Sequence, residues 1–585
     1  MLRVALSRAI GNGYEPNRAL PFAASRSSLL LLRGAAFIKN SWEVDAIYKD
    51  KKTGLMLPDS LRPQAKGYSE AGASRTRRAL KGFTAQSGSP REDIDNSNDT
   101  LRQRSRMLYM SSPVATSAIN TNRTKVVGMG LTLKSTIDRE VLGLSPEVAK
   151  EWQHKTEAEF GLWANSRQNC DALGLNNFAA LQQLALKSWL LSGDAFVLFR
   201  RKDPTPLNPY GLRLHVIEAD RVCTPNGIYG NRTVSGVTEG IVPDDAPGAG
   251  HRIHDGVEVD KDGTVVAYHI CDHFPGDWVS AAFKWTRVLA SGANTGLPNV
   301  LHIMDSERPD QYRGVPYLAQ VIEPLLQLRR YTESELWAAL IQTFFTAWIE
   351  SESNPLDMPF SEIGSGEGAE GDAPTGTISD DDHEYEMGPG EVFHLKTGEK
   401  VVFGNPNVPS AGFETFFNTM VMQMGAALEQ PADVLLKKFD QSYSAARGAL
   451  LEAWEAVKMR RAWFVDDMCQ PTYEVWLAEA VARGRIKAPG FFDDPLLRKA
   501  WCGAQWMGPV QSQLDPKKEA EAAILLINRG IKTHAQVTRE MTGGDWEENI
   551  AILADENKRL TEAGGNLAVN VTAETEEGDD DNAEA

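Results

Sequence analysis

Cysteine is scarce in this sequence of 585 residues. The five cysteines are an odd number with no CxxC pair among them: Cys170, Cys223, Cys271, Cys469 and Cys502. A disulfide framework requires an even set of cysteines in an oxidising compartment, and a structural zinc site requires closely spaced ligand pairs. The cysteines therefore predict free thiols in a reducing compartment.

Long apolar runs are missing as well. The longest candidate, residues 28–38, is interrupted by Arg33, whereas a helix that crosses a bilayer needs about 18 or more consecutive apolar residues. We therefore expect no membrane-spanning segment and no membrane partner.

The motifs of several enzyme classes do not occur anywhere in the sequence. It has no GxxxxGK loop for the phosphates of a nucleotide, no GxSxG turn for a nucleophilic serine and no HExxH helix for zinc. Gly388-Pro389-Gly390 is typical of a turn and not of a phosphate-binding loop. We expect no catalytic activity and no cofactor.

Two clusters of polar residues partly match metal sites: His269, Cys271 and His273, and then Glu258, Asp260 and Asp262 before Gly263. On a strand the first three side chains would share a face, as metal ligands could, but no fourth ligand stands nearby. The second cluster lacks the glutamate that closes a calcium loop, because His269 occupies that position. We favour strand alternation for the first cluster and a hairpin turn for the second, with a metal site as the alternative.

The net charge of −18 is unevenly distributed. Residues 1–130 contain 21 Lys and Arg against 10 Asp and Glu, so the rest of the chain is strongly acidic. Such a chain should not grip DNA tightly by neutralising phosphates, although DNA could pass along a surface that repels it weakly.

Both ends of the sequence have a biased composition. Residues 1–40 contain six Lys and Arg and the single acid Glu15, which suits an organellar transit peptide or, as we favour, a flexible basic arm. We expect order to begin only near Arg75. Residues 574–585 contain seven acids and no base, which predicts a disordered tail.

Residues 75–310 combine helix and strand patterns in one mixed α+β domain. Helices are predicted over residues 98–126 and after the caps Ser145-Pro146 and Asn177. Strands are predicted at residues 195–200, 212–216 and 265–271.

Two long helices and an insertion follow. The apolar stripe after residues 313–316 predicts a helix to about Ile349, roughly 50 Å long at about 1.5 Å per residue. A second helix covers residues 412–429 and ends at Gln430-Pro431. The insertion between them is acidic and rich in glycine, with strand patterns at residues 391–395 and 400–403. This arrangement predicts a rod with a cap on its end.

A polar elbow, residues 432–443, joins the second helix to a third. We expect Ser444 to cap the third helix and Pro471 to kink it without ending it. The elbow carries Lys437, Lys438 and Gln441. Two lysines in such a loop either contact a nucleic-acid backbone or are merely solvated.

Further features of the third helix and of the chain after it point to packing. We expect Arg460-Arg461 to bridge helices or subunits, and Trp454 and Trp463 to belong to the core. Shorter helices are predicted to begin at Asp515-Pro516, Thr533 and Asp545.

Nine short stretches of the sequence lie in a characteristic order: residues 101–106 (LRQRSR), 126–128 (VVG), 192–196 (SGDAF), 267–269 (AYH), 274–277 (FPGD), 313–317 (RGVPY), 441–447 (QSYSAAR), 452–454 (EAW) and 460–461 (RR). In these stretches the chain resembles the portal proteins of tailed phages, specifically the lambda-like family. The resemblance covers roughly residues 70–560, and the first 70 residues match only loosely.

The resemblance implies an α+β, mainly helical fold, the phage portal fold, which assembles as a ring of usually twelve subunits. Its implied parts are a flexible basic arm (1–74), the wing (75–316), a stem helix (317–351), the clip (352–410), a second stem helix (411–431), the tunnel loop (432–443), a kinked helix returning to the wing (444–500), the crown (501–565) and a disordered acidic tail (566–585).

The resemblance also implies a function. The ring would be the channel for double-stranded DNA at one capsid vertex, with Lys437, Lys438 and Gln441 of the tunnel loop approaching the DNA. Its implied partners are the terminase large subunit, the head–tail connector, and the major capsid and scaffolding proteins, in a virion assembled in the host cytoplasm. Alternatives are the terminase large subunit itself, an ATPase and nuclease, or a capsid or scaffolding protein.

Overall fold

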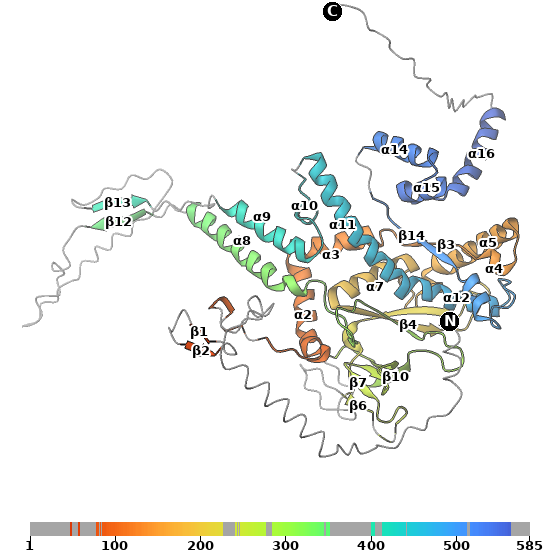
Figure 1. Ribbon diagram of the computed structural model, residues 1–585, viewed down its shortest axis with the longest axis horizontal. Helices are drawn as coiled ribbons and strands as arrows, with labels where there is room; N and C mark the ends of the chain where they lie inside the picture. Colours follow the sequence, from red (N-terminus) through yellow and green to blue (C-terminus); the bar gives the residue numbers. More distant parts are fainter. Residues whose placement is uncertain are drawn as a thin grey trace, which may run out of the picture. The chain divides into compact units, whose positions relative to one another are not determined.

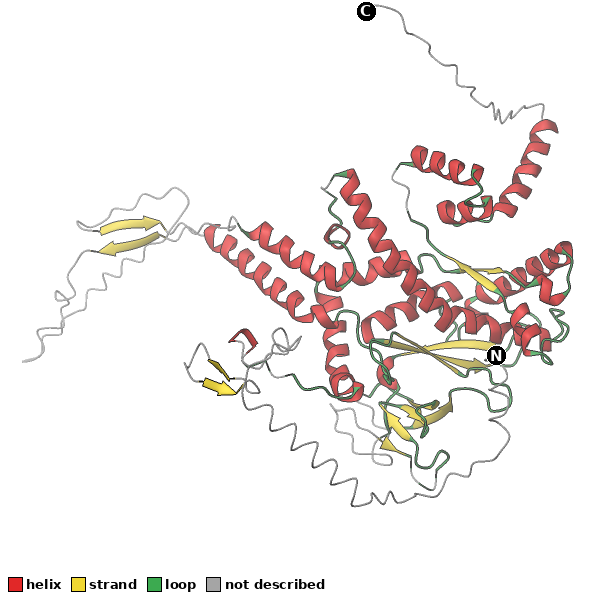
Figure 2. Ribbon diagram, in the orientation of Figure 1, coloured by secondary structure: helices red, strands yellow, loops and turns green. Residues whose placement is uncertain are grey.

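The structure is a computed structural model that falls into two compact units, residues 1–87 and 88–585. It describes residues 47–49, 56–58, 78–80, 82–83, 85–225, 240–242, 244, 246–275, 283–343, 347–351, 399–403, 412–439, 442–511 and 515–562. Figure 1 labels the elements along the chain, and Figure 2 shows that helices predominate over strands. The prediction of a mainly helical α+β fold is therefore confirmed.

In the smaller unit, the strands β1 (Ile47–Lys49) and β2 (Met56–Pro58) pair in antiparallel fashion, with Tyr48 opposite Leu57. A 3-10 turn, η3 (Arg78–Leu80), follows. Our expectation of no order before Arg75 was wrong for these two strands. Apolar and aromatic residues such as Ile47, Tyr48 and Leu57 favour strands.

The first elements of the larger unit are helical, and α5 and α7 among them begin at predicted caps. They are the π-helical turn η4 (Arg91–Asp95), α2 (Asn96–Ser111), α3 (Pro113–Val126), α4 (Arg139–Leu142), α5 (Pro146–Ala164), α6 (Arg167–Cys170) and α7 (Phe178–Ser192). As predicted, the side chains of Ser145 and Asn177 accept hydrogen bonds from backbone amides in the first turns of α5 and α7. The single helix expected over residues 98–126 is instead broken at Ser112, which is extended because it precedes Pro113.

Four antiparallel sheets are described in this unit, and three of them are considered first. Their strands are β3 (Thr132–Ser135), β4 (Asp194–Arg201), β5 (Leu212–Ile217), β6 (Gly240–Ile241), β7 (Arg252–His254), β8 (Val257–Val259), β9 (Val265–Cys271), β10 (Trp285–Leu289), β11 (Val300–Met304) and β14 (Ala504–Met507). The strand orders are β11-β4-β5, β10-β9-β8-β7-β6 and β14-β3. Strands β4, β5 and β9 confirm the three strand predictions.

The turn between β8 and β9 confirms the predicted hairpin. Asp260 Oδ1 accepts hydrogen bonds from the backbone amides of Asp262 and Thr264, at 2.9 and 2.8 Å. Gly263 has φ +85°, a left-handed conformation that glycine adopts without strain. The carboxylates before this glycine therefore shape a turn.

After the 3-10 turns η5 (Ala219–Arg221) and η6 (Ala319–Val321), the chain forms the first long helix, α8 (Ile322–Thr343). We expected this helix to reach about Ile349, but residues 347–351 form β12 (Ala347–Ser351), which pairs with β13 (Glu399–Phe403). The bulky residue Trp348 lies opposite Val402, and Ile349 opposite Val401. Such β-branched and aromatic pairs favour a strand over a helix. The strand pattern at residues 391–395 lies outside the described residues.

The second long helix and the chain after it follow the predicted order. They are α9 (Phe413–Ala427), α10 (Ala432–Leu436), α11 (Tyr443–Phe464), the π-helical turn η8 (Val465–Cys469) and α12 (Gln470–Ala482). The elbow is not wholly a loop, because its first residues form the short helix α10. The side chains of Val434 and Leu435 on this helix are buried. The cap of α11 is Ser442 rather than the predicted Ser444. The helix continues through η8 past Pro471, as predicted for a kink.

The last elements are α13 (Pro495–Trp501), strand β14, α14 (Pro516–Asn528), α15 (His534–Thr542) and α16 (Trp546–Glu562). Asp515 caps α14, and Thr533 forms a capping box with Gln536 at the start of α15, so these predicted starts are confirmed. Helix α16 begins directly after Asp545, as predicted. Because β14 pairs with β3, residues 504–507 belong to a sheet of the main body.

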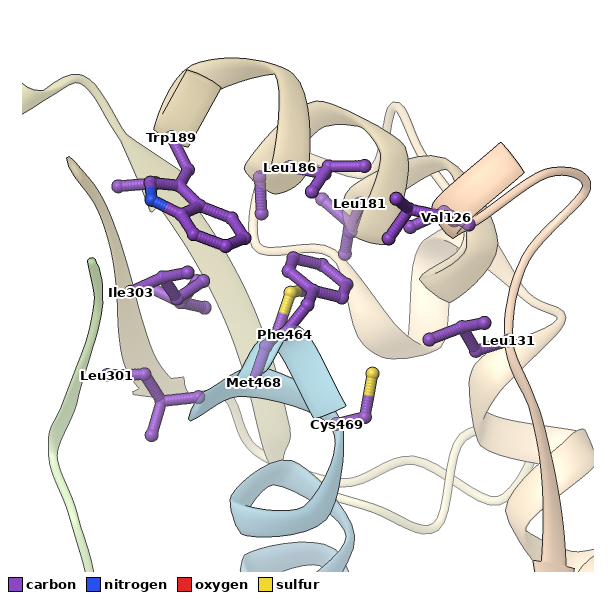
Figure 3. Packing of buried hydrophobic residues seen from close by; sticks show 14 of the residues in the cluster. Val126, Leu131, Leu181, Leu186, Trp189, Leu301, Ile303, Phe464, Met468 and Cys469 are labelled. Atoms are coloured by element: carbon purple, nitrogen blue, oxygen red, sulfur yellow. The ribbon is translucent and has the colours of Figure 1, made fainter. Parts of the chain in front are cut away.

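The largest core lies where the kinked helix crosses α7 and the three-stranded sheet. Figure 3 shows Phe464 and Met468 in the same cluster as Leu186 and Trp189 of α7 and Ile303 of β11. All five cysteines are free and buried. Within the described residues, no helix has the length and apolar character that crossing a membrane requires.

A buried ionic cluster joins stretches that are far apart in the sequence. Arg313 is fully buried; its Nε lies 2.6 Å from Asp194 Oδ2 and its Nη1 lies 2.7 Å from Asp255 Oδ2. Arg102 of α2 adds a contact of 3.3 Å to Asp255. Next to the cluster, a Cβ on Gly314 would lie only 1.9 Å from the Gly193 carbonyl oxygen. Three of the nine stretches singled out in the sequence, those with Arg102, Asp194 and Arg313, therefore meet at this cluster.

Candidate nucleic-acid interface

The two lysines of the elbow point to different helices. Lys437 ends α10 in the left-handed conformation, with φ 57°, and its Nζ donates a hydrogen bond of 2.5 Å to Thr121 Oγ1 on α3. Lys438 Nζ lies 3.3 Å from Glu414 Oε1 on α9, and both of these side chains are exposed. Gln441, the third predicted site residue, lies outside the described residues.

Lys437 also lies near a third lysine, Lys125 of α3. Burial lowers the pKa of Lys437 below its ordinary value. Burial, and then the charge of Lys437, lowers the pKa of Lys125. The charged form of each lysine is therefore less favourable here than in water, and an anion between the two would make it more favourable.

Both of these lysines line an open groove of about 610 Å³ between the end of α2, α3 and the elbow. The other lining residues are mostly hydroxyl and amide side chains: Ser111, Ser112, Thr116, Ser117, Asn120, Thr121 and Thr124. No carboxylate is among the lining residues that the structure describes. Ammonium and hydroxyl groups donate hydrogen bonds, so the groove suits a phosphate better than a cation.

The junction before the elbow is held rigidly against α3 and α11. Gln430 Nε2 donates hydrogen bonds to the Ala118 carbonyl oxygen, at 3.0 Å, and to Tyr317 Oη, at 3.1 Å. The Tyr317 hydroxyl donates in turn to the Leu428 carbonyl oxygen. Arg460 of α11 pairs with Glu429 and lies 4.9 Å from the centre of the Tyr317 ring. The position of α10 relative to α3 is therefore fixed by hydrogen bonds.

The paired arginines bridge helices, as predicted. Arg460 Nη1 donates to Asn122 Oδ1 of α3 at 3.1 Å. Arg461 donates to the carbonyl oxygens of Val126 and Lys125 at the end of α3, at 2.9 and 2.6 Å. Trp454 and Trp463 are partly buried and pack against the core, which agrees with their predicted place.

His269 of β9 takes part in a structural ion cluster with Glu258, to which His251 also belongs. His269 Nε2 lies 3.0 Å from Glu258 Oε2, and Arg287 donates two hydrogen bonds of 2.7 Å to the same carboxylate. Burial raises the pKa of Glu258, but the hydrogen bonds from Arg287 and from the two histidines outweigh it and hold that pKa at about 2. No group of three or more metal-ligating side chains occurs within the described ranges. The strand interpretation of His269 and Cys271 is confirmed.

Sequence reasoning proposed Lys437 as a site residue but did not propose its neighbours on α3. Thr121 and Lys125 are four residues apart, so they share one face of a helix, and this spacing was a usable signal. What it could not reveal is that α10 packs against α3, because residues 121 and 437 are 316 positions apart.

Comparisons with known proteins give the family context of this geometry. The family model described as phage portal protein, lambda family, matches residues 76–461. Portal protein B of Escherichia phage lambda is 23% identical over 467 residues, covering 78% of this chain and 83% of that protein. The portal protein of Escherichia phage N15 is 23% identical over 470 residues, covering 78% and 84%.

Among solved structures, a chain from the neck of an empty GTA particle computed with C6 symmetry is 13% identical. It covers 76% of this chain and 92% of that one, with a TM-score of 0.38. A superposition this loose does not bear on the argument.

Proposed function

Because this chain belongs to the lambda family of phage portal proteins, we propose that it forms the ring-shaped DNA channel at one vertex of a phage capsid. The ring docks the terminase motor during genome packaging and the head–tail connector afterwards, and it retains the DNA until ejection. The observation that carries the proposal is the family match, which spans α8, α9, the elbow and most of α11.

The parts of the portal fold correspond to elements of the structure in this proposal. Helices α8 and α9 are the stem, and residues 432–443 are the tunnel loop. The clip is residues 352–410, which include strand β13, together with the preceding strand β12. The mixed α+β body is the wing, and α14, α15 and α16 are the crown. The structure supports a later start of the crown than residue 501, because β14 is paired with β3 of the body.

The tunnel loop contacts the phosphate backbone in this proposal, through Lys437 and Lys125 rather than through the elbow alone. The support is the groove that holds both lysines, which offers many hydrogen-bond donors and no described carboxylate. Contacts to phosphates carry no sequence information. An otherwise acidic channel then binds DNA weakly enough for it to slide.

The proposed partners are further copies of the chain in a ring of twelve, double-stranded DNA, the terminase large subunit, the head–tail connector, and the major capsid and scaffolding proteins. The protein acts without catalysis and without a cofactor, as a conduit. Its place is the portal vertex of the virion, after assembly in the host cytoplasm.

Electron microscopy of the purified chain, alone and with capsid and scaffolding proteins, tests the architecture. We expect rings in end-on views with an open central channel. Closed shells without a channel would favour a capsid or scaffolding protein, and ATP hydrolysis by the pure chain would favour the terminase alternative.

The double variant K437A/K438A tests the proposed DNA contact. We expect rings to assemble as in the wild type but packaging or retention of DNA to fall, and K437A alone to give most of the loss because Lys438 is paired with Glu414. The matched control is K517A/K518A, which removes two adjacent exposed lysines of α14. Unchanged packaging and retention in K437A/K438A would mean that these lysines are only solvated.

A further inference from the structure

Helix α8 carries an exposed stripe of side chains that its own partner helix does not cover. Leu326, Arg330, Glu333 and Trp337 are spaced by four, three and four residues, so they lie on one face of the helix. Trp337 is 65% exposed and Leu326 39% exposed. We call these four residues the α8 ridge. An exposed tryptophan flanked by charges is typical of the anchor of a protein interface.

The α8 ridge faces away from α9. The contact between the two helices runs through Tyr331, whose ring stacks on Phe413 at 5.4 Å and meets Phe416 edge-on at 4.9 Å. Tyr331 lies about 100° around the helix from Arg330. In Figure 1, α8 runs along one side of α9, whereas α10 and α11 lie toward the other side. All four side chains of the ridge are exposed, and no residue in the described part of the chain covers them.

A groove with room for an aromatic side chain lies on the side of α9 away from α8. It is open, has a volume of about 760 Å³, and is formed by α9, the start of α10 and α11. Met422 and Met459, which are 55% and 50% exposed, and the small residues Ala426 and Ala456 line it. We call it the α11 groove. Small residues leave room for a large side chain, and methionine adapts its shape to an aromatic ring.

Charges on the two surfaces are complementary. Arg330 of the ridge and Glu452 on the wall of the groove are both exposed, and neither forms an ion pair with any residue that the structure describes. The other described charges of the groove have partners, since Glu455 pairs with Lys458 and Glu429 with Arg460. One unmatched cation and one unmatched anion thus stand on the two surfaces.

We infer that the α8 ridge of one copy of this chain seats in the α11 groove of the next copy, with Trp337 as the anchor and Arg330 facing Glu452. The inference rests on the ring assembly proposed above and names the surfaces that make it. The two surfaces differ from each other, so their contact is head-to-tail, and a head-to-tail contact closes into a ring when its rotation permits. A twofold pairing of identical patches would leave one of the two surfaces unused.

Charge reversal in the full-length chain tests this contact. We expect R330E and E452R each to lower the fraction of protein in rings about tenfold at low micromolar concentration, because like charges then face each other in every interface. The double variant R330E/E452R should recover the wild-type ring fraction. W337A should also lose rings. The control R559E reverses an exposed arginine of α16 and should assemble normally.

Mixing the two single variants shows whether the contact joins different copies. In a mixture of R330E and E452R, every contact between unlike copies has opposite charges, so rings of alternating copies should form, as counted by native mass spectrometry. A misfolded variant could not be rescued in this way. Rings from both single variants at wild-type levels, or no recovery on mixing, would overturn the inference while leaving the proposed function intact. Failure of the wild type to form rings even with capsid and scaffolding proteins would instead overturn the proposed function.

Discussion

The body around the sheets and the last three helices of the chain are built from opposite kinds of contact. In the body, Arg313 and Asp194 are withdrawn from water and paired with each other, and Trp476 is wholly buried. Helices α14, α15 and α16 contain no buried residue, although Leu525 and other apolar side chains lie on their surfaces. Burial therefore stabilises the body but contributes little to these helices.

The last helices also contact the body through ion pairs near the surface, unlike the buried ion pairs within the body. These surface pairs include Lys150–Glu547, at 3.0 Å, in which both side chains are more than half exposed, and Arg447–Glu519, at 3.2 Å. Exposed pairs of this kind contribute about 0–1 kcal/mol each and weaken in salt. The body is therefore stabilised by burial within the chain, whereas the last helices bury little apolar surface among the residues that the structure describes.

The largest expected effect comes from breaking the buried ionic cluster of the body. In R313L, Asp194 and Asp255 lose the cation that offsets their burial, and removing one partner of a buried pair costs about 3–5 kcal/mol. We expect the free energy of unfolding, measured by urea titration, to fall by about this amount. The control R329L removes an exposed partner of Glu333 on α8 and should cost less than about 1 kcal/mol. Equal stability of R313L and R329L would contradict the comparison.

A second prediction uses the pH dependence of the same cluster. Burial raises the pKa of Asp95 from 3.8 to about 6, beside Arg313, Asp255, Arg102 and Asp194. Between about pH 4 and pH 6 the folded state therefore binds more protons than the unfolded state, so stability contributed by this group falls as the pH rises and is constant above that window. Two pKa units correspond to about 3 kcal/mol.

The variant D95N removes this titration. We expect it to be more stable than the wild type at pH 7 by up to about 3 kcal/mol, with the difference vanishing below about pH 4. Urea titrations of both proteins from pH 4 to pH 8 measure it, and the difference between the two curves isolates Asp95 from other titrating groups such as Asp467. A difference that does not change across this range would show that Asp95 carries no excess proton in the folded state.

Local structure was predictable from the sequence where a short-range signal decides it. The caps at Ser145, Asn177 and Thr533 and the turn at Gly263 depend on neighbours within a few residues, and each was predicted correctly. Trp348 illustrates the limit. Its apolar stripe fits a helix, but pairing with Val402 across an insertion of some fifty residues makes it part of a strand.

The candidate site and the ionic cluster show the same limit on a larger scale. Lys437 could be picked out in the sequence, but its partners Thr121 and Lys125 could not, because the packing of α10 on α3 brings them together. Likewise the stretches around Arg102, Asp194 and Arg313 were each recognised, while their meeting in one buried cluster depends on long-range packing. Sequence patterns identify such residues singly, and only the fold shows which of them act together.

The smallest expected effect concerns the surface of the last helices. Leu525 on α14 is 58% exposed, so L525A removes little buried apolar area from the single subunit and should change its free energy of unfolding by less than about 0.5 kcal/mol. The matched control is L477A on α12, where the leucine is fully buried and truncation should cost about 2–5 kcal/mol. Urea titration of monomeric protein measures both. If L525A cost as much as L477A, the last helices would have a core of their own and the contrast with the body would fail, whereas a loss that appears only in assembled rings would show that neighbouring molecules cover this surface.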